Sequence, residues 1–289
     1  MTLEFWFMFP IAIAVATIAM STGIGGAIFF SPIFLLVLGL DPAVAIGTAL
    51  ITELFGFTSG LVAYVRQRLV DYKMGLQVLM FAVPAAIFGA SVAEHVPDDI
   101  LKAIFGVGIL FVGSQIFVAW YGERREEMGQ KIEAEQLSLS GGYAQHVVTD
   151  RSGREFRYNV FNKPVAAVYS SIGGAFLGMI SVGLAELMEY QMVAKCRIPP
   201  PVAVATSIFM VVITVAAASV GHVVSFVAQG PAVMEQVLSI AMFTAPGVVI
   251  GGQLGPYVQK VAPPELMKVV ISGVFGVVGV FMLISVAFL

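Results

Sequence analysis

The sequence predicts an all-α integral membrane protein with two inverted repeats, each a broken or re-entrant helical hairpin followed by three transmembrane helices. Composition is the first observation behind this prediction. Of the 289 residues, 58% are hydrophobic and 11% are charged, with a mean hydropathy of +0.94, whereas soluble domains carry roughly 25% charged residues. The second observation is eight long apolar runs, in place of the alternating segments of about 10 residues that form a membrane barrel. The third is that blocks of the first half recur in the second.

The first apolar run, residues 5–38, is too long for one crossing. It has 34 residues, and a helix needs about 20 to cross the hydrocarbon core. Its centre reads STGIGGAIFFSP, residues 21–32, and a straight helix disfavours such glycines and an internal proline. We therefore expect two short helices with a break between them. The runs at 43–65, 74–93 and 100–120 each have the length of a single crossing.

A polar insert, residues 121–163, separates the two halves. It begins as a charged helix extension and continues as QHVVTDRSGREFRYNV, two β-prone runs around a loop that contains glycine. This pattern predicts a β-hairpin. The predicted organisation is a first transmembrane repeat at 1–120, the insert, and a second transmembrane repeat at 164–289.

The second half repeats the order of the first. PAVAIGTAL at 42–50 aligns with PVAVATSIF at 201–209, and PDDILKAIFGVGILFVG at 97–113 aligns with PPELMKVVISGVFGVVG at 263–279. Its first run is again over-long and is interrupted by glycine in MISVGLAE. The later runs predict three further helices at about 200–228, 235–258 and 266–289.

The positions of the basic residues select the folded-back version of both over-long runs. If each run crosses once, the basic residues outside the insert split three against five. If each run folds back, they split seven against one, and only Lys102 lies opposite the others. Because basic residues stay cytoplasmic, we expect a multi-pass protein of the cytoplasmic membrane with both termini outside and the insert in the cytoplasm. The seven are Arg66, Arg68, Lys73, Lys195, Arg197, Lys260 and Lys268.

The two breaks predict a substrate site at the bilayer midplane. Paired interrupted segments in repeated halves point to a transporter site, and a helix N-terminus stabilises an anion by about 0.3–1 kcal/mol. Half-helices that begin after Gly26 and after Gly183 would supply such N-termini. The alternative is that the small residues only let helices pack closely. The expected hydroxyl donors are Ser21, Thr22, Thr48, Ser181, Thr206 and Ser207.

Two acids fall inside apolar runs, Glu53 in TALITELFG and Glu186 in SVGLAELMEY. An acid at the centre of a membrane helix costs about 2.5–3.5 kcal/mol, so it is functional by default. Beside an anion site, burial and like charge would favour the protonated form, and we expect proton coupling. The alternative is a neutral acid hydrogen-bonded between helices, for example to Thr52. A lone histidine, His222, is read as a packing residue.

The sequence carries no enzyme motif. GFTSG at 56–60 differs in spacing from the serine motif of intramembrane proteases, and HExxH, P-loop and dinucleotide motifs are missing. One cysteine and three distant histidines match no metal spacing. We therefore expect that the protein is not an enzyme and binds no cofactor. Its expected partners are a small anionic substrate and the lipid bilayer, and it is not expected to bind nucleic acid. A homo-oligomer is left open.

At this point the motifs resemble a known family. The stretch STGIGGAIFFSPIFLLVLGLDPAVAIGTAL and the pair ISVGLAE and PPPVAVATS are similar to the TauE/SafE sulfite exporter family, also called the toluene sulfonate uptake permease superfamily. The resemblance implies a permease that exports sulfite or a short organosulfonate. One departure is Ala27 in place of a third glycine. The resemblance places binding residues at Gly23, Gly25, Gly26, Gly47, Thr48, Gly183, Thr206 and Ser207.

Together these expectations give a secondary transporter that exports a small sulfur oxyanion with proton coupling. One alternative is a carrier of other small anions, such as thiosulfate or short carboxylates. The other is a non-transporting membrane subunit whose insert docks a cytoplasmic partner.

Overall fold

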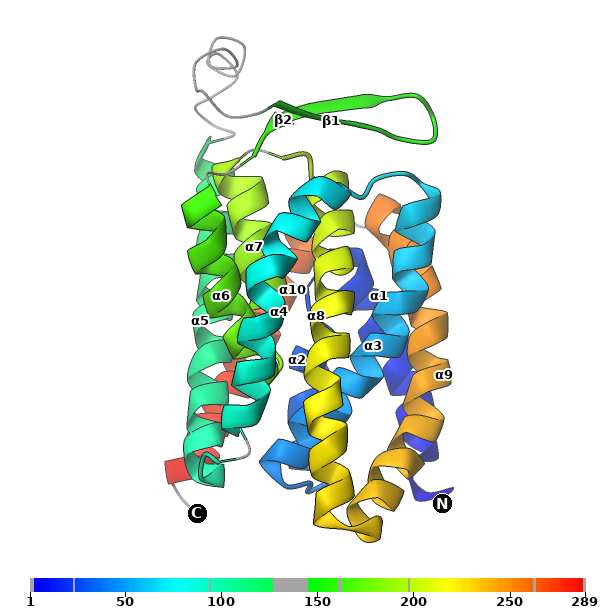
Figure 1. Cartoon of the computed structure of the whole chain (residues 1–289), viewed down its shortest axis with the longest axis vertical. Coiled ribbons are helices and arrows are strands. Elements are labelled where there is room, and N and C mark those ends of the chain that lie inside the picture. The colour runs from blue at the N-terminus through cyan, green and yellow to red at the C-terminus, as the bar shows by residue number, and fades with distance from the viewer. Residues whose placement is uncertain are drawn as a thin grey trace.

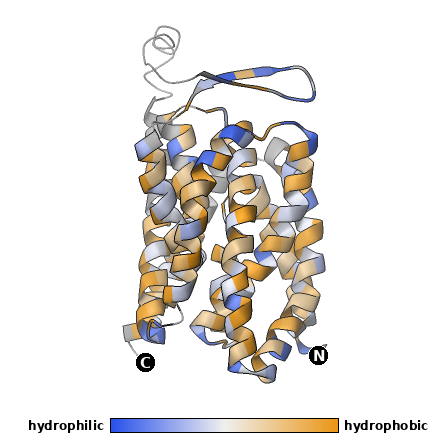
Figure 2. Cartoon of the chain, viewed as in Figure 1, coloured by the Kyte–Doolittle hydropathy of each residue, from blue (hydrophilic) through white to orange (hydrophobic). Residues whose placement is uncertain are grey.

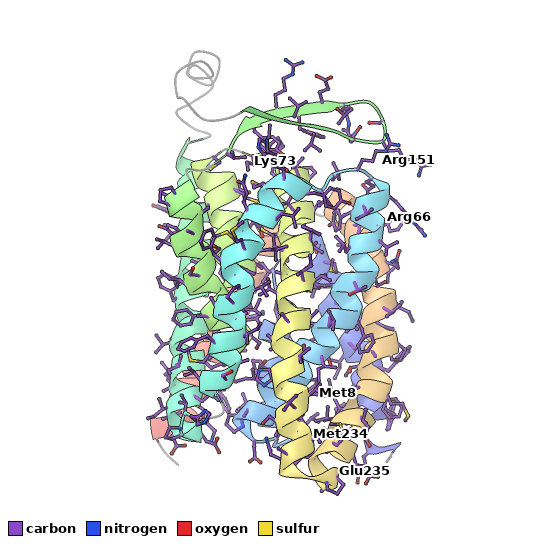
Figure 3. The ribbon with its side chains drawn as sticks, in the orientation of Figure 1. Met8, Arg66, Lys73, Arg151, Met234 and Glu235 are labelled. Atoms are coloured by element: carbon purple, nitrogen blue, oxygen red, sulfur yellow. The ribbon has the colours of Figure 1, made fainter. Side chains whose placement is uncertain are left out.

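The computed structural model describes residues 3–22, 24–93, 95–126, 145–160, 163–196, 198–261 and 264–287. Within them the chain is a bundle of helices capped at one end by a β-hairpin (Figure 1). The helix α1 begins and α10 ends at the opposite end of the bundle. We call these two ends the hairpin end and the termini end. Arg66, Lys73 and Arg151 lie at the hairpin end, whereas Met8 and Met234 lie towards the termini end (Figure 3).

The helices follow the order expected from the sequence. In the first half they are η1 (Leu3–Phe7), α1 (Met8–Thr22), α2 (Ala27–Pro32), η2 (Ile33–Val37), α3 (Pro42–Arg66), α4 (Tyr72–Ala93) and α5 (Asp98–Glu126). In the second half they are α6 (Lys163–Ile180), α7 (Leu184–Tyr190), η3 (Gln191–Lys195), α8 (Pro200–Gln229), α9 (Pro231–Val261) and α10 (Pro264–Ala287). Prolines open α3 and α8, at the helix position where the missing N–H is not needed. The fold class, an all-α membrane protein, is confirmed, and the inverted relation of the repeats stays a prediction.

Among the described residues, five helices are long and apolar enough to cross a membrane: Glu4–Thr22, Pro42–Arg66, Tyr72–Ala93, Pro200–Gln229 and Pro231–Val258. Large apolar side chains point outward along the bundle, among them Met80 (68% exposed), Phe88 (67%) and Val277 (72%). Hydrophobic residues cover the length of the helices, and hydrophilic ones gather on the hairpin and at the helix ends (Figure 2). Such an apolar surface suits lipid.

The first over-long run is broken and reverses direction. The Tyr64 hydroxyl, near the hairpin end of α3, donates to the Met20 carbonyl at 2.9 Å. Ser31 instead shares a cavity with Pro42, the first residue of α3, at the termini end. The chain therefore turns back between Met20 and Ser31. We call the segment between Thr22 and Ala27 the first break.

The second over-long run reverses in the opposite sense. The helix α6 leaves the hairpin end and stops at Ile180, where Ser181 (φ 57°) and Gly183 (φ 122°) adopt left-handed backbone conformations. The following α7 and η3 return to the hairpin end, because Thr206 in α8 accepts a hydrogen bond from the Asp71 N–H at 3.0 Å, just before α4. We call the segment between Ile180 and Leu184 the second break.

Glycines let several helix pairs approach closely. A Cβ on Gly174 or Gly178 of α6 would collide with backbone carbonyls of α4, and one on Gly247 or Gly251 of α9 would collide with the backbone of α1. Small residues at such contacts are typical of helix packing in membranes. These four glycines therefore serve close helix packing, which was the alternative explanation for the small residues. The described glycines of the two breaks do not lie at these helix contacts.

The β-hairpin lies across the hairpin end of the bundle (Figure 1). Strands β1 (Gln145–Thr149) and β2 (Glu155–Asn159) pair antiparallel, with Val147 opposite Arg157. In the turn, hydrogen bonds from the Ser152 side chain and from Arg154 lower the pKa of Asp150 to about 2. Residues 127–144 of the insert lie outside the described residues, so the proposed domain boundaries stay a prediction.

A buried polar cluster joins the hairpin to the helices. The Asp71 carboxylate, 6% exposed, accepts from the Tyr158 hydroxyl at 2.9 Å and lies 2.5 Å from His146 Nδ1. Burial and the neighbouring Asp71 raise the pKa of Tyr158. The Arg151 N–H also donates to the Gln67 carbonyl at 3.0 Å. Strand residues are thus fixed to the loop that joins α3 to α4.

Candidate functional site

The two breaks meet inside the bundle on one carboxylate. The Gly25 N–H of the first break donates to Glu186 Oε1 at 3.2 Å, and the Gly183 N–H of the second break donates to Glu186 Oε2 at 2.9 Å. Glu186 stands in the first turn of α7, where a carboxylate reaching back to the preceding backbone N–H is a known capping arrangement. The hydrogen bond from Gly25 is not part of this cap, because Gly25 lies 161 residues away in sequence. It connects the first half of the chain to the Glu186 carboxylate.

A second carboxyl group lies at the same place. Glu53 of α3 is 2% exposed and faces the backbone amides of Gly26 and Ala27, where α2 begins. Neither of its oxygens makes a well-formed hydrogen bond to any group in the described part of the chain. A Cβ placed on Gly25 would lie 3.1 Å from Glu53 Oε1 and 3.4 Å from Glu186 Oε1. The two acids therefore share one small volume beside the first break.

Two serines join the breaks on the other side. Ser31 Oγ and Ser181 Oγ lie 2.7 Å apart, and both residues are 2% exposed. Because the Ser181 hydroxyl donates to the Ile180 carbonyl at 2.7 Å, Ser31 is the donor within the pair. Ser31 was not among the residues expected from the sequence. It follows Gly26 by five positions, and its pairing with Ser181 depends on a contact between the two halves of the chain.

Four of the other expected hydroxyls donate within their own helices, and Thr206 instead accepts from the Asp71 N–H. Ser21 donates to the Ile18 carbonyl and Thr22 to the Ile18 and Ala19 carbonyls. Thr48 donates to Val44, and Ser207 donates to Val204. The structure therefore brings together Gly25, Gly26, Ser181 and Gly183 with both acids, and it does not direct Thr48 or Ser207 to that place. Gly23 lies outside the described residues.

Three further residues considered from the sequence have packing contacts. A Cβ on Gly47 would collide with Phe226 and His222 of α8, which explains the glycine by close approach. His222 is 1% exposed, and its Nε2 lies 3.2 Å from the Gly178 carbonyl. Thr52, considered as a partner for Glu53, instead pairs with Thr244 of α9 at 3.0 Å.

No group of three or more histidine, cysteine, aspartate or glutamate residues could hold a metal ion in the part of the chain that the structure describes. The site has backbone N–H groups, hydroxyls and two carboxyls. Such a set can bind an oxyanion and exchange a proton with it.

Comparison with known proteins decides the family. A family model described as Sulfite exporter TauE/SafE matches residues 8–282. The chain belongs to this family. Its members are membrane transporters and not enzymes, so the protein is a multi-pass membrane transporter, as the resemblance implied.

Two relatives extend over most of the TauE/SafE chain described here. The Bacillus subtilis protein named probable membrane transporter protein YunE is 24% identical over 265 residues, 89% of each chain. Probable membrane transporter protein YjnA of the same organism is 25% identical over 245 residues, 81% of this chain and 84% of the relative. Probable membrane transporter protein ORF9 of a Sinorhizobium species is 34% identical over 98 residues, 34% of this chain and 37% of the relative. No solved structure matches.

Proposed function

We propose that this TauE/SafE transporter is a secondary carrier that exports a small sulfur oxyanion, sulfite or a short organosulfonate, with proton coupling. The observation that carries the proposal is the carboxylate of Glu186 held between the amides of Gly25 and Gly183. A carboxylate is itself an oxyanion on a short stem. The backbone that binds it has the geometry to bind a free oxyanion, and among the described residues no lysine or arginine bonds to this carboxylate that would make release difficult.

The Glu186 carboxylate and the transported anion compete for the same two amides in this proposal. While Glu186 is ionised it occupies them. Once it is protonated, its hydrogen bonds lose their charge assistance, and a substrate anion replaces it. Loss of the proton restores the carboxylate, which displaces the anion. Protonation and anion binding therefore favour each other, so export down the gradient of the anion carries the proton outward with it.

Glu53 is the second proton-carrying group of the proposal. Burying an ionised carboxyl without a partner is costly, and in the described part of the chain Glu53 makes neither a salt bridge nor a well-formed hydrogen bond. Its protonated form suits the site when Glu186 is ionised. A proton shared between the two acids would neutralise one of them at every stage.

The expected test is transport by purified protein in liposomes. Wild-type protein should move labelled sulfite or sulfoacetate at a rate that rises with an imposed pH gradient. In Glu186→Gln the side chain keeps one acceptor oxygen and cannot ionise, so we expect anion exchange to persist and its rate to change by less than about twofold over one pH unit, a step across which an ionising group changes its ratio of charged to neutral form about tenfold. Glu53→Gln should weaken the pH dependence in the same direction. Glu155→Gln, in the exposed hairpin, is the matched control and should behave as wild type.

Three outcomes would contradict parts of the proposal. Wild-type pH coupling in both Glu186→Gln and Glu53→Gln would remove the proton role. Faster flux of thiosulfate or a short carboxylate than of any sulfite or sulfonate would favour the alternative carrier. Flux equal to that of empty liposomes for every small anion would favour the docking role of the insert.

A further inference from the structure

Three exposed arginines meet at one corner of the hairpin end. Arg66 ends α3, and Arg68 follows it in the loop to α4. The Arg151 N–H, in the turn of the hairpin, donates to the Gln67 carbonyl at 3.0 Å, so Arg151 stands beside both. Figure 3 shows Arg66 and Arg151 at the same corner. Two distant segments of the chain thus bring their guanidinium groups to one place, which we call the arginine corner.

The acids near the arginine corner have other partners. Asp150, next to Arg151 in sequence, pairs with Arg154 at 2.8 Å, and Asp71 bonds to two side chains of the hairpin. Within the part of the chain that the structure describes, none of the three arginine side chains makes an ion pair with an acid. Their charge is therefore open to a ligand from outside the chain.

The backbone of Arg68 has a left-handed conformation, with a φ of 58°. It ends α3 in a turn in which the Leu69 N–H donates to the Tyr64 carbonyl at 3.3 Å. Glycine is usual at such a position, because it adopts positive φ without steric cost. Turn geometry alone would therefore favour glycine here, and an exposed guanidinium group is what arginine adds.

Two exposed stripes on α3 and α9 lead up to the arginine corner. Both helices run from the termini end to the hairpin end (Figure 1), and Gln253 of α9 donates to the Ser59 carbonyl of α3 at 2.6 Å. Exposed residues recur every three or four positions, which places them on one face of each helix. They are Phe55, Ser59, Val62 and Arg66 on α3, and Ile250, Leu254, Tyr257 and Val261 on α9. Because Gln253 stands one turn before Tyr257, the two stripes lie side by side.

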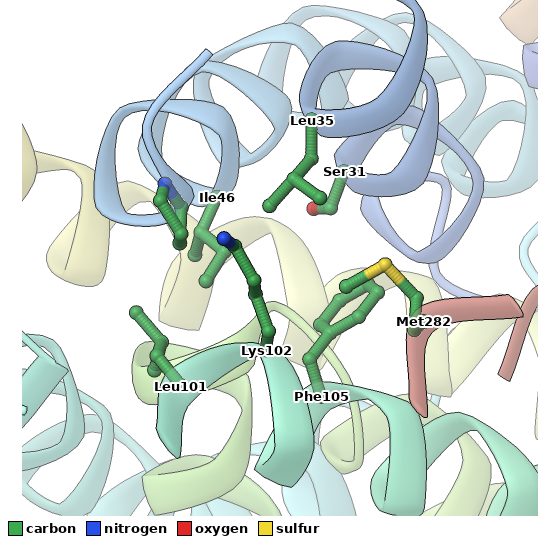
Figure 4. A pocket seen from close by; sticks show the side chains of 8 residues that line it. Ser31, Leu35, Ile46, Leu101, Lys102, Phe105 and Met282 are labelled. Atoms are coloured by element: carbon green, nitrogen blue, oxygen red, sulfur yellow. The ribbon is translucent and has the colours of Figure 1, made fainter. Parts of the chain in front are cut away.

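Lys102, near the termini end, has a different setting. It lies 3.8 Å from Asp99 and lines a cavity together with Leu35, Phe105 and Met282 (Figure 4). That cavity measures about 10 Å³, which is about the volume that one water molecule needs. It therefore has no room for a phosphate group, whereas the arginine corner is open at the surface.

We propose that the arginine corner binds an anionic phospholipid, whose phosphate is held by Arg66, Arg68 and Arg151 and whose acyl chains lie along the two stripes. Guanidinium groups bind phosphate oxygens through paired hydrogen bonds, and basic residues at the end of a membrane helix attract anionic lipids. Tyrosine is enriched where lipid headgroups meet the hydrocarbon core, which suits the exposed Tyr257. Because Arg151 belongs to the hairpin, the bound lipid joins the hairpin to the end of α3. This site does not depend on which solute the transporter carries.

The test measures lipid binding to the purified full chain in detergent. Native mass spectrometry counts the lipid retained on titration with phosphatidylglycerol, or with phosphatidylcholine of the same acyl chains. Wild type should bind phosphatidylglycerol more tightly. In Arg66→Gln, Arg151→Gln and Arg68→Gly, we expect an affinity for phosphatidylglycerol about fivefold lower, the scale of one basic residue near an anionic lipid surface, with phosphatidylcholine unaffected. The matched control is Lys73→Gln, which removes one charge from an exposed position at the same end, away from the corner (Figure 3), and should bind as wild type does.

Arg68→Gly decides if another variant fails to fold, because glycine suits the φ of 58°. Equal affinities of wild type for the two lipids, wild-type affinity in Arg68→Gly, or an equal loss in Lys73→Gln would overturn the site. Glycerophosphoglycerol, the same headgroup without acyl chains, should not displace the lipid at a similar concentration. Displacement would show a site for soluble phosphate compounds and overturn the lipid assignment. Since no transport substrate is present, each outcome leaves the proposed carrier function unaffected.

Discussion

At Gly25 the main chain itself acts as the ligand, and the space around it is already filled. Its N–H binds Glu186, and a Cβ there would lie 3.1 Å from Glu53 Oε1. Real Cβ atoms rarely come so close to a neighbour. The side chain that a substitution adds would therefore occupy the volume that the substrate or the carboxylates need.

For Gly25→Val we expect anion binding to be lost, with an affinity for sulfite at least about tenfold lower than wild type, since the two branches displace both carboxyls. Gly25→Ala should give a smaller decrease in the same direction. The matched control is Gly276→Ala, because a Cβ there meets nothing within 4 Å and alanine favours a helix by up to about 1 kcal/mol over glycine. Binding can be measured by calorimetry in detergent. Unaltered affinity in Gly25→Val would show that the first break serves packing only.

Sequence reasoning identified individual residues unevenly, and the reason is physical. Glu53 and Glu186 were detectable because a charge inside an apolar run is costly wherever the helix lies. Gly25 and Gly183 were detectable because a break needs backbone freedom. Ser31 was not assigned to a site, because its pairing with Ser181 depends on how the two halves of the chain meet.

At the scale of elements, the sequence predicted the breaks and the strands but not the contacts between them. Run length and glycine content are local properties, and they placed the first break within 21–32 and the strands around residues 150–153. The docking of the hairpin by Asp71, His146 and Tyr158 joins residues 75 and 87 positions apart. The local sequence pattern does not predict such a pairing, because nothing in either segment indicates its distant partner.

The hairpin should be held in place by this buried cluster. In His146→Ala, Asp71 loses one of its two side-chain partners from the hairpin, and a hydrogen bond to a charged group contributes about 1.5–3 kcal/mol. We expect the amides of residues 145–159 to exchange hydrogen about tenfold faster or more, measured by mass spectrometry, while the helices keep wild-type protection. His95→Ala, at an exposed position at the far end of α4, is the control. Unchanged exchange in His146→Ala would show that the backbone contact between Arg151 and Gln67 is enough to hold the hairpin.

At the scale of the whole molecule, the distribution of charge predicts how the protein sits in the membrane. Both termini lie at one end and the hairpin at the other, and Arg66, Lys73 and Arg151 gather at the hairpin end (Figure 3). Positively charged loops remain in the cytoplasm. With the hairpin end in the cytoplasm as predicted, an exported anion would enter at the end rich in cations and leave at the termini end.

This orientation predicts the accessibility of single cysteines in intact cells. With the natural thiol removed by Cys196→Ser, Glu4→Cys should react with a membrane-impermeant maleimide added outside, because residue 4 is exposed at the termini end. Ser152→Cys, exposed in the hairpin turn, should react only after the membrane is permeabilised. The two variants serve as controls for each other, since both become labelled in detergent. The reverse pattern would place the hairpin outside, and the export path would then run from the termini end to the hairpin end.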